Sequence, residues 1–226
     1  MIPSTGGRAG RRQRRQKRIK PRQAKRALYV DFESRKVEGE APVLLGVLYD
    51  KAPEASVSEW VLRQFVFDPA CARVDAVAGS SCESSSTDAA LTWLLSLSES
   101  ERRHVVSWSR YDRKRIEQLT GRSAFRYRNA IPTAKRWRKQ QRTAGTIDDG
   151  GPNELERYER LVGYLRPSER YGVGDAIAYI RGLAGVTAGA VDRWRCLVEH
   201  NRHDLLAMRE VIEHAVGLRP PPGAGG

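Results

Sequence analysis

The chain has 226 residues, a mass of 25.4 kDa and a net charge of +13, a length sufficient for one well-packed core. No run approaches the roughly 18 apolar residues needed to span a bilayer, so we predict no membrane association. The three cysteines (Cys71, Cys82 and Cys196) form no C-x-x-C pair, which argues against a disulfide framework and a cysteine-rich zinc site and favours a reducing, intracellular setting over secretion.

The positive charge is concentrated at the N-terminus. Residues 1–26 contribute +11 and contain no acid, so the rest of the chain carries only +2. A block of like charge with few large apolar residues is expected to be a disordered arm. Its natural partner is nucleic acid, to be contacted by residues such as Arg11, Arg12, Arg14 and Arg15, because each neutralised phosphate releases counterions. A solubilising tail or a localisation signal is the alternative, and we expect a cytoplasmic or nucleoid-associated protein.

Three strands are predicted at the start of the folded part. In Ala27–Glu33 the alternation places Leu28, Val30 and Phe32 on one face and Tyr29, Asp31 and Glu33 on the other. Pro42–Tyr49 and Glu59–Phe67 are also rich in β-branched and aromatic residues. Because short turns join the three, we predict an antiparallel meander.

The remaining segments alternate helices with one short strand. We predict a loop at 74–86, a strand at 104–109, a loop at 145–153, and helices at 89–97, 111–119, 154–165, 174–181 and 188–216. Strands followed by helices that alternate with a short strand indicate a single α/β domain over residues 27–217. A flexible Pro- and Gly-rich tail is expected at 218–226.

Asp31 and Glu33 are the first candidates for chemistry. An apolar strand rarely carries two carboxylates on one face, because each buried charge needs a partner. A divalent cation is a natural partner, since it prefers oxygen ligands. The alternative is an edge strand whose polar face is exposed to water.

Asp112 follows the strand at 104–109, at a strand-to-helix turn where α/β proteins tend to bind ligands. The alternative for Asp112 is an ordinary role as the N-cap of the next helix. His200 and Asp204 are four residues apart in the last predicted helix and therefore project from one face. They are either a surface pair or a general base beside a metal ligand.

These residues resemble the motifs of the DEDD exonucleases, a ribonuclease H-like family of 3′→5′ exonucleases, and the resemblance covers roughly residues 27–216. YVDFES (29–34) is similar to the first motif, SWSRYDRKRIEQL (107–119) to the second and LVEHNRHDLLAM (197–208) to the third, while RYGVGDAI (170–177) is similar to the element that precedes the last helix. Two positions depart from the pattern. The third motif usually has Tyr four residues or His five residues before its Asp, whereas this chain has His200 and Glu199 there, and Ser109 stands near a frequent Asn.

The resemblance implies a ribonuclease H-like mixed sheet, with an antiparallel three-strand meander plus parallel strands, flanked by helices. It also implies a 3′→5′ exonuclease that hydrolyses DNA or RNA, from a single strand or a 3′ end, with two Mg²⁺ or Mn²⁺ ions. In that scheme Asp31 bridges both ions, Glu33 and Asp204 complete one site, Asp112 supports the other, and His200 is the general base. The alternatives are a catalytically weak nucleic-acid-binding or adaptor module and a structure-directed endonuclease.

A basic run at Lys135, Arg136 and Trp137 is a further candidate for contact with nucleic acid. It combines positive charge with an aromatic ring, as proteins that bind single strands often do. The alternative is a solvated helix whose Trp side chain points inward.

Overall fold

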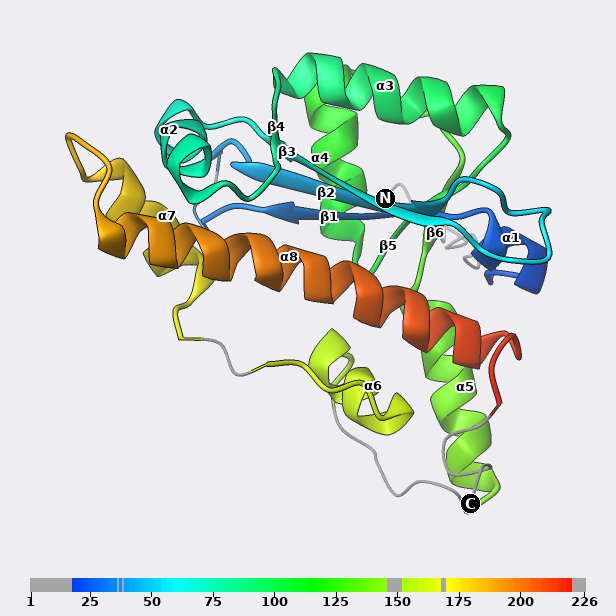
Figure 1. Cartoon of the computed structure of the whole chain (residues 1–226). Helices are drawn as coiled ribbons and strands as arrows, with labels where there is room; N and C mark the ends of the chain where they lie inside the picture. Colours follow the sequence, from blue (N-terminus) through cyan, green and yellow to red (C-terminus); the bar gives the residue numbers. More distant parts are fainter. Residues whose placement is uncertain (1–17, 36, 38, 146–151, 168–169, 221–226) are drawn as a thin grey trace, which may run out of the picture.

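A six-stranded mixed sheet forms the centre of the molecule, in the computed structural model that describes residues 18–35, 37, 39–145, 152–167 and 170–220 (Figure 1). The strand order is β4-β3-β2-β1-β5-β6. The strands are β1 (Leu28–Glu33), β2 (Leu44–Asp50), β3 (Trp60–Val66), β4 (Glu83–Ser84), β5 (Val105–Ser107) and β6 (Tyr127–Asn129). Strands β1, β2 and β3 are antiparallel neighbours, whereas β5 pairs in parallel with both β1 and β6. The predicted α/β class and the antiparallel meander are therefore confirmed.

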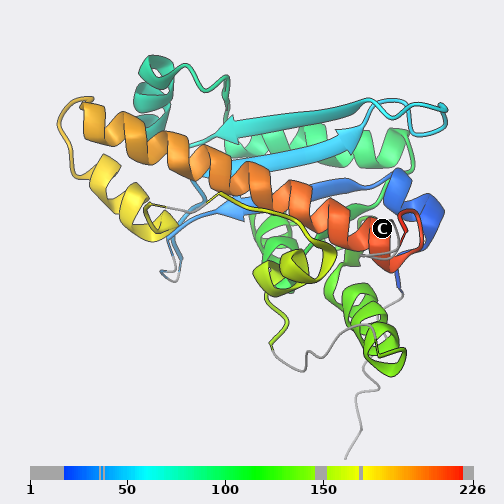
Figure 2. The ribbon, with the colours of Figure 1, turned by 60° about the horizontal axis from the view of Figure 1, so that its bottom comes forward.

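Helices cover both faces of the sheet. They are α1 (Pro21–Lys25), α2 (Pro69–Ala78), α3 (Thr87–Ser100), α4 (Arg110–Thr120), α5 (Ile131–Thr143), α6 (Leu155–Val162), α7 (Val173–Arg181) and α8 (Ala188–Ala215). Figure 1 shows α3 and α4 on one face and the long α8 crossing the other, with α5 and α6 beyond α8. The view in Figure 2, turned by 60°, also shows α8 lying obliquely across the strands.

The alternation predicted for β1 decides which residues meet each helical layer. Leu28, Val30 and Phe32 belong to the core formed with α3 and α4. Tyr29, from the opposite face, packs with Met208 and other residues of α8. Asp31 and Glu33 share the face of Tyr29 and therefore lie under α8.

Gly46 allows α8 to approach the sheet closely. It lies opposite both Asp31 on β1 and Gln64 on β3. A Cβ atom at this position would lie 2.1 Å from Oδ1 of Asn201 and 2.5 Å from Cδ1 of Leu205. The missing side chain therefore makes room for α8 directly beside Asp31.

Several sequence predictions were wrong. Order does not begin at Ala27, because α1 lies within the predicted arm and Ile19 is buried at 4% exposure. The segment 74–86, predicted as a loop, contains the C-terminal half of α2 and also β4. Asp68 caps the N-terminus of α2 by accepting hydrogen bonds from the Ala70 and Cys71 amides. Strand β6 was not predicted, since three residues that include an arginine carry almost no periodic signal.

The five predicted helices correspond to α3, α4, α6, α7 and α8, and their bounds agree within a few residues at each end. Arg11, Arg12, Arg14 and Arg15 lie outside the described residues, as do most of the 145–153 loop and residues 221–226 of the tail. No helix among the described segments is long and apolar enough to cross a membrane.

Candidate metal centre

Four carboxylates from three elements come together under α8. Strand β1 supplies Asp31 and Glu33, the first turn of α4 supplies Asp112, and the middle of α8 supplies Asp204. Glu33, Asp204 and Asp112 all lie close enough to Asp31 to raise the pKa of its carboxyl. Residues distant in sequence therefore form one acidic cluster in which Glu33 and Asp112 are buried. The edge-strand alternative for Asp31 and Glu33 is wrong, since β1 pairs with a strand on each side and Glu33 is only 6% exposed.

Glu33, His200 and Asp204 form the tightest group. One potential ligand atom from each residue lies within 4.8 Å of the others. Nε2 of His200 is 3.8 Å from Oε1 of Glu33 and 3.5 Å from Oδ2 of Asp204. The spacing of four residues thus places His200 and Asp204 on the side of α8 that faces β1, so they are not a surface pair.

Asp112 is held against the backbone of β1. The N-cap of α4 is Ser109, whose Oγ accepts a hydrogen bond from the Tyr111 amide, so the N-cap alternative for Asp112 is wrong. Burial raises the pKa of Asp112 to about 6, although hydrogen bonds from its own amide, from Ser107 and from the Phe32 amide oppose that rise. Asp112 therefore lies near β1, close enough to Asp31 to raise the pKa of that carboxyl.

The cluster has the properties of a site for a hard cation. Burial is the main cause that raises the pKa of Asp31, and it raises the pKa of Glu33 to about 7. Oε1 of Glu33 is buried and has no hydrogen-bond partner among the described residues. Buried carboxylates repel one another and need compensation, and a divalent cation with oxygen ligands supplies it. The residues present therefore fit such an ion.

Asn201 orients Asp31. Its Nδ2 lies 2.9 Å from Oδ2 of Asp31 and 3.2 Å from the Asp31 carbonyl oxygen, and it donates to both. Its Oδ1 accepts a hydrogen bond of 3.0 Å from Nε2 of Gln64. The sequence analysis missed Asn201, although its spacing of four residues from both Leu197 and Leu205 marks a polar residue within the core stripe of the helix.

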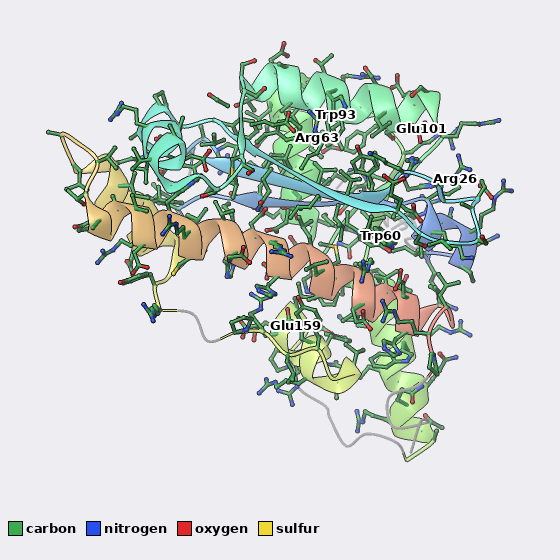
Figure 3. The ribbon with its side chains drawn as sticks, viewed as in Figure 1. Arg26, Trp60, Arg63, Trp93, Glu101 and Glu159 are labelled. Carbon is green, nitrogen blue, oxygen red and sulfur yellow. The ribbon has the colours of Figure 1, made fainter. Side chains whose placement is uncertain are left out.

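Arg166 is a cation inside the cluster that the sequence analysis also missed. The residue follows α6, and its guanidinium donates hydrogen bonds to Asp204 and to Glu159. Figure 3 labels Glu159, which projects from α6 toward α8. Burial raises the pKa of Glu159, although Arg166 lowers it. No motif surrounds Arg166, so nothing in the sequence indicated this contact.

The contact between Arg166 and His200 determines which imidazole nitrogen carries the proton. Nη1 of Arg166 lies 3.4 Å from Nδ1 of His200. A guanidinium only donates hydrogen bonds, so Nδ1 must accept and the proton of a neutral ring is at Nε2. In this arrangement Nε2 points an N–H group at Glu33 and Asp204.

The predicted basic run has a mixed outcome. Lys135 and Arg136 are exposed on α5, where they are available to an anionic partner. Trp137 is only 4% exposed and packs with Tyr158, Val162 and Val211. Its predicted role as a stacking platform is therefore wrong, because the ring faces the core between α5, α6 and α8.

Comparison of the chain with protein-family models, with curated proteins and with solved structures finds no match. The functional argument consequently depends on the geometry of the cluster and on its chemistry.

Proposed function

We propose that the protein is a metal-dependent 3′→5′ exonuclease of DNA or RNA with a ribonuclease H-like fold. The observation that carries the proposal is the group of Asp31, Glu33, Asp112 and Asp204 beside His200, in which the buried Oε1 of Glu33 has no hydrogen-bond partner among the described residues. The continuation of an antiparallel meander into parallel strands on the far side of β1 agrees with that fold.

Each carboxylate has a distinct part in the proposed centre. Asp31 is the most central, since the other three acids all influence its charge, and Asn201 holds its orientation. Glu33 and Asp204 lie near His200, while Asp112 lies near the Phe32 amide. Two divalent ions held by these residues would supply Lewis-acid stabilisation of the attacking and leaving oxygens.

His200 is the proposed general base. It would take a proton from the water that attacks phosphorus as the bond to the leaving 3′ oxygen breaks. This requires a lone pair at Nε2, and hence a proton at Nδ1, where Arg166 now donates. We therefore propose that Arg166 turns from His200 to a phosphate oxygen when substrate binds, where its charge stabilises the transition state.

The ion pair between Arg166 and Asp204 also favours a second candidate function. An internal cation that already neutralises Asp204 is compatible with a nucleic-acid-binding module of low catalytic activity. A structure-directed endonuclease with the same centre is the third candidate.

The test is the degradation of 5′-labelled single-stranded DNA and RNA with Mg²⁺ or Mn²⁺. We compare the wild type with Asp31→Asn and with Asp88→Asn, a matched change at an exposed acid in the first turn of α3. A ladder that shortens from the 3′ end, absent in EDTA and in Asp31→Asn but retained in Asp88→Asn, is the expected result. Internal cleavage of a substrate with a blocked 3′ end would identify an endonuclease. Binding without cleavage under either metal would favour the adaptor.

A further inference from the structure

A group of basic side chains lies at the β5–β6 edge of the sheet, apart from the metal centre. Arg126 and Arg128 are two residues apart at β6 and therefore point to the same side. His104 directly precedes β5, and the amide of the next residue, Val105, donates a hydrogen bond of 2.8 Å to the Arg126 carbonyl. Three basic side chains thus meet where the two strands begin.

This group lacks an anionic partner within the described part of the chain. Burial and the charges of Arg128 and Arg126 lower the pKa of His104 to about 4. Burial and the charge of Arg126 lower the pKa of Arg128, and its Nε is buried with no hydrogen-bond partner among the described residues. Cations that lower one another's pKa are stabilised when an anion binds between them.

Two basic segments distant in sequence meet beside this group. The amide of Ile19 donates a hydrogen bond of 3.0 Å to Oγ1 of Thr133 on α5, and the amide of Leu28 donates one of 2.9 Å to the His104 carbonyl. The start of the described chain, which carries Lys20, is therefore attached beside both β5 and α5. Figure 1 shows α1 at the end of the sheet where β1 begins.

Helix α5 extends the positive surface. Between residues 118 and 147 the sequence has eight Arg and Lys and no acid, and Lys135, Arg136, Lys139 and Arg142 on α5 are exposed. Not every cation nearby contributes, because Arg26 is paired with Glu54 and Arg122 with Glu99. The extended face therefore consists of β6, α5 and the residues around α1.

We propose that Arg126, Arg128 and His104 form a phosphate-binding site for the backbone of a nucleic-acid strand, continued by the exposed cations of α5. This site deepens the proposed function and rests on it for the identity of the substrate. It holds the strand outside the metal centre, by charge and without reading sequence. The ligand is a phosphate group of the nucleic-acid backbone, since this surface offers cations and N–H donors.

The experiment measures binding of fluorescently labelled single-stranded DNA and RNA to the full chain in EDTA, over a series of salt concentrations. Arg126→Glu is compared with Arg73→Glu, the same charge reversal at an exposed arginine of α2. We expect Arg126→Glu to weaken binding about tenfold for any sequence and to lower the salt slope by about one. Arg128→Gln should have a smaller effect in the same direction.

Equal affinities and salt slopes for Arg126→Glu and Arg73→Glu would overturn the proposal. A second readout is the His104 imidazole followed by NMR, whose pKa should rise when the oligonucleotide is added to the wild type and should stay unchanged in Arg126→Glu. Cleavage by the same variants with Mg²⁺ separates the two proposals. If the wild type does not cleave but Arg126→Glu selectively loses binding, the nuclease proposal is rejected and the phosphate site is retained. If the wild type cleaves but Arg126→Glu shows no selective loss of binding, the phosphate site is rejected and the nuclease proposal is retained.

Discussion

Asn201 on α8 and Asp31 on β1 are joined by a side-chain hydrogen bond of 2.9 Å. Gln64 on β3 donates to the amide oxygen of Asn201, so the amide cannot rotate without losing that bond. Three elements therefore determine the direction of one carboxylate. Because Asp31 is the most central acid of the cluster, this arrangement links the packing of α8 to the chemistry of the proposed centre.

Asn201→Ala should weaken Mn²⁺ binding by about 10- to 100-fold, the usual effect of removing a residue that orients a metal ligand. Isothermal titration calorimetry measures this directly, and thermal unfolding checks that the variant folds. Arg202→Ala, at an exposed neighbour on α8, is the control. Unchanged Mn²⁺ affinity in Asn201→Ala would show that metal binding by Asp31 does not depend on the side-chain amide of Asn201.

Gly46→Ala should destabilise the protein by about 1–3 kcal/mol, because the new methyl group would overlap the Asn201 and Leu205 side chains. Gly174→Ala in α7 is the matched control, since nothing lies within 4 Å of a Cβ there and alanine is the better helix former. Urea unfolding should therefore show opposite signs for the two substitutions. A stable Gly46→Ala would mean that α8 can move away from β2 at little cost.

Arg166→Gln should bind Mn²⁺ about tenfold more tightly in the absence of nucleic acid, because the guanidinium no longer competes for Asp204. The same variant should cleave more slowly at saturating substrate, since the proposed contact with the phosphate is lost. Arg170→Gln, at an exposed arginine on the same connection, provides the control. Weaker Mn²⁺ binding by Arg166→Gln would indicate that Arg166 supports the metal centre instead.

The stability of the metal-free protein should depend on pH through the buried acids. The pKa of Glu33 in the folded protein is about 7, above its ordinary value of 4.5. The folded state therefore binds this proton more tightly than the unfolded state does. The contribution of the protonated Glu33 carboxyl to the stability of the folded state is complete below pH 4.5 and is lost as the pH rises to about 7.

Glu33→Gln removes that dependence and is the way to measure it. In EDTA the variant should gain stability relative to the wild type as the pH rises from about 4 to 7, by up to about 3 kcal/mol. Thermal unfolding at several pH values gives the difference, and saturating Mn²⁺ should reverse it by stabilising the wild type more than the variant. A difference that does not change with pH would mean that Glu33 titrates normally.

Local periodicity was sufficient for much of the site. The alternation in β1 predicted that Asp31 and Glu33 share a face, and the spacing in α8 predicted the same for His200 and Asp204, because both patterns depend on backbone geometry alone. The α/β class followed from the order of strands and helices. Asp112 does lie near Asp31, although Ser109 rather than Asp112 caps α4.

Other features depend on which elements pack together, and no local pattern contains that information. Arg166 reaches Asp204 only because the connection after α6 passes along α8, and Trp137 is buried only because α6 and α8 cover that side of α5. Likewise Arg126, Arg128 and His104 meet because β5 and β6 pair in parallel. The amino-acid sequence by itself determined which side chains share a strand or helix face. Only the tertiary structure decided which faces meet, since those contacts join residues far apart in the chain.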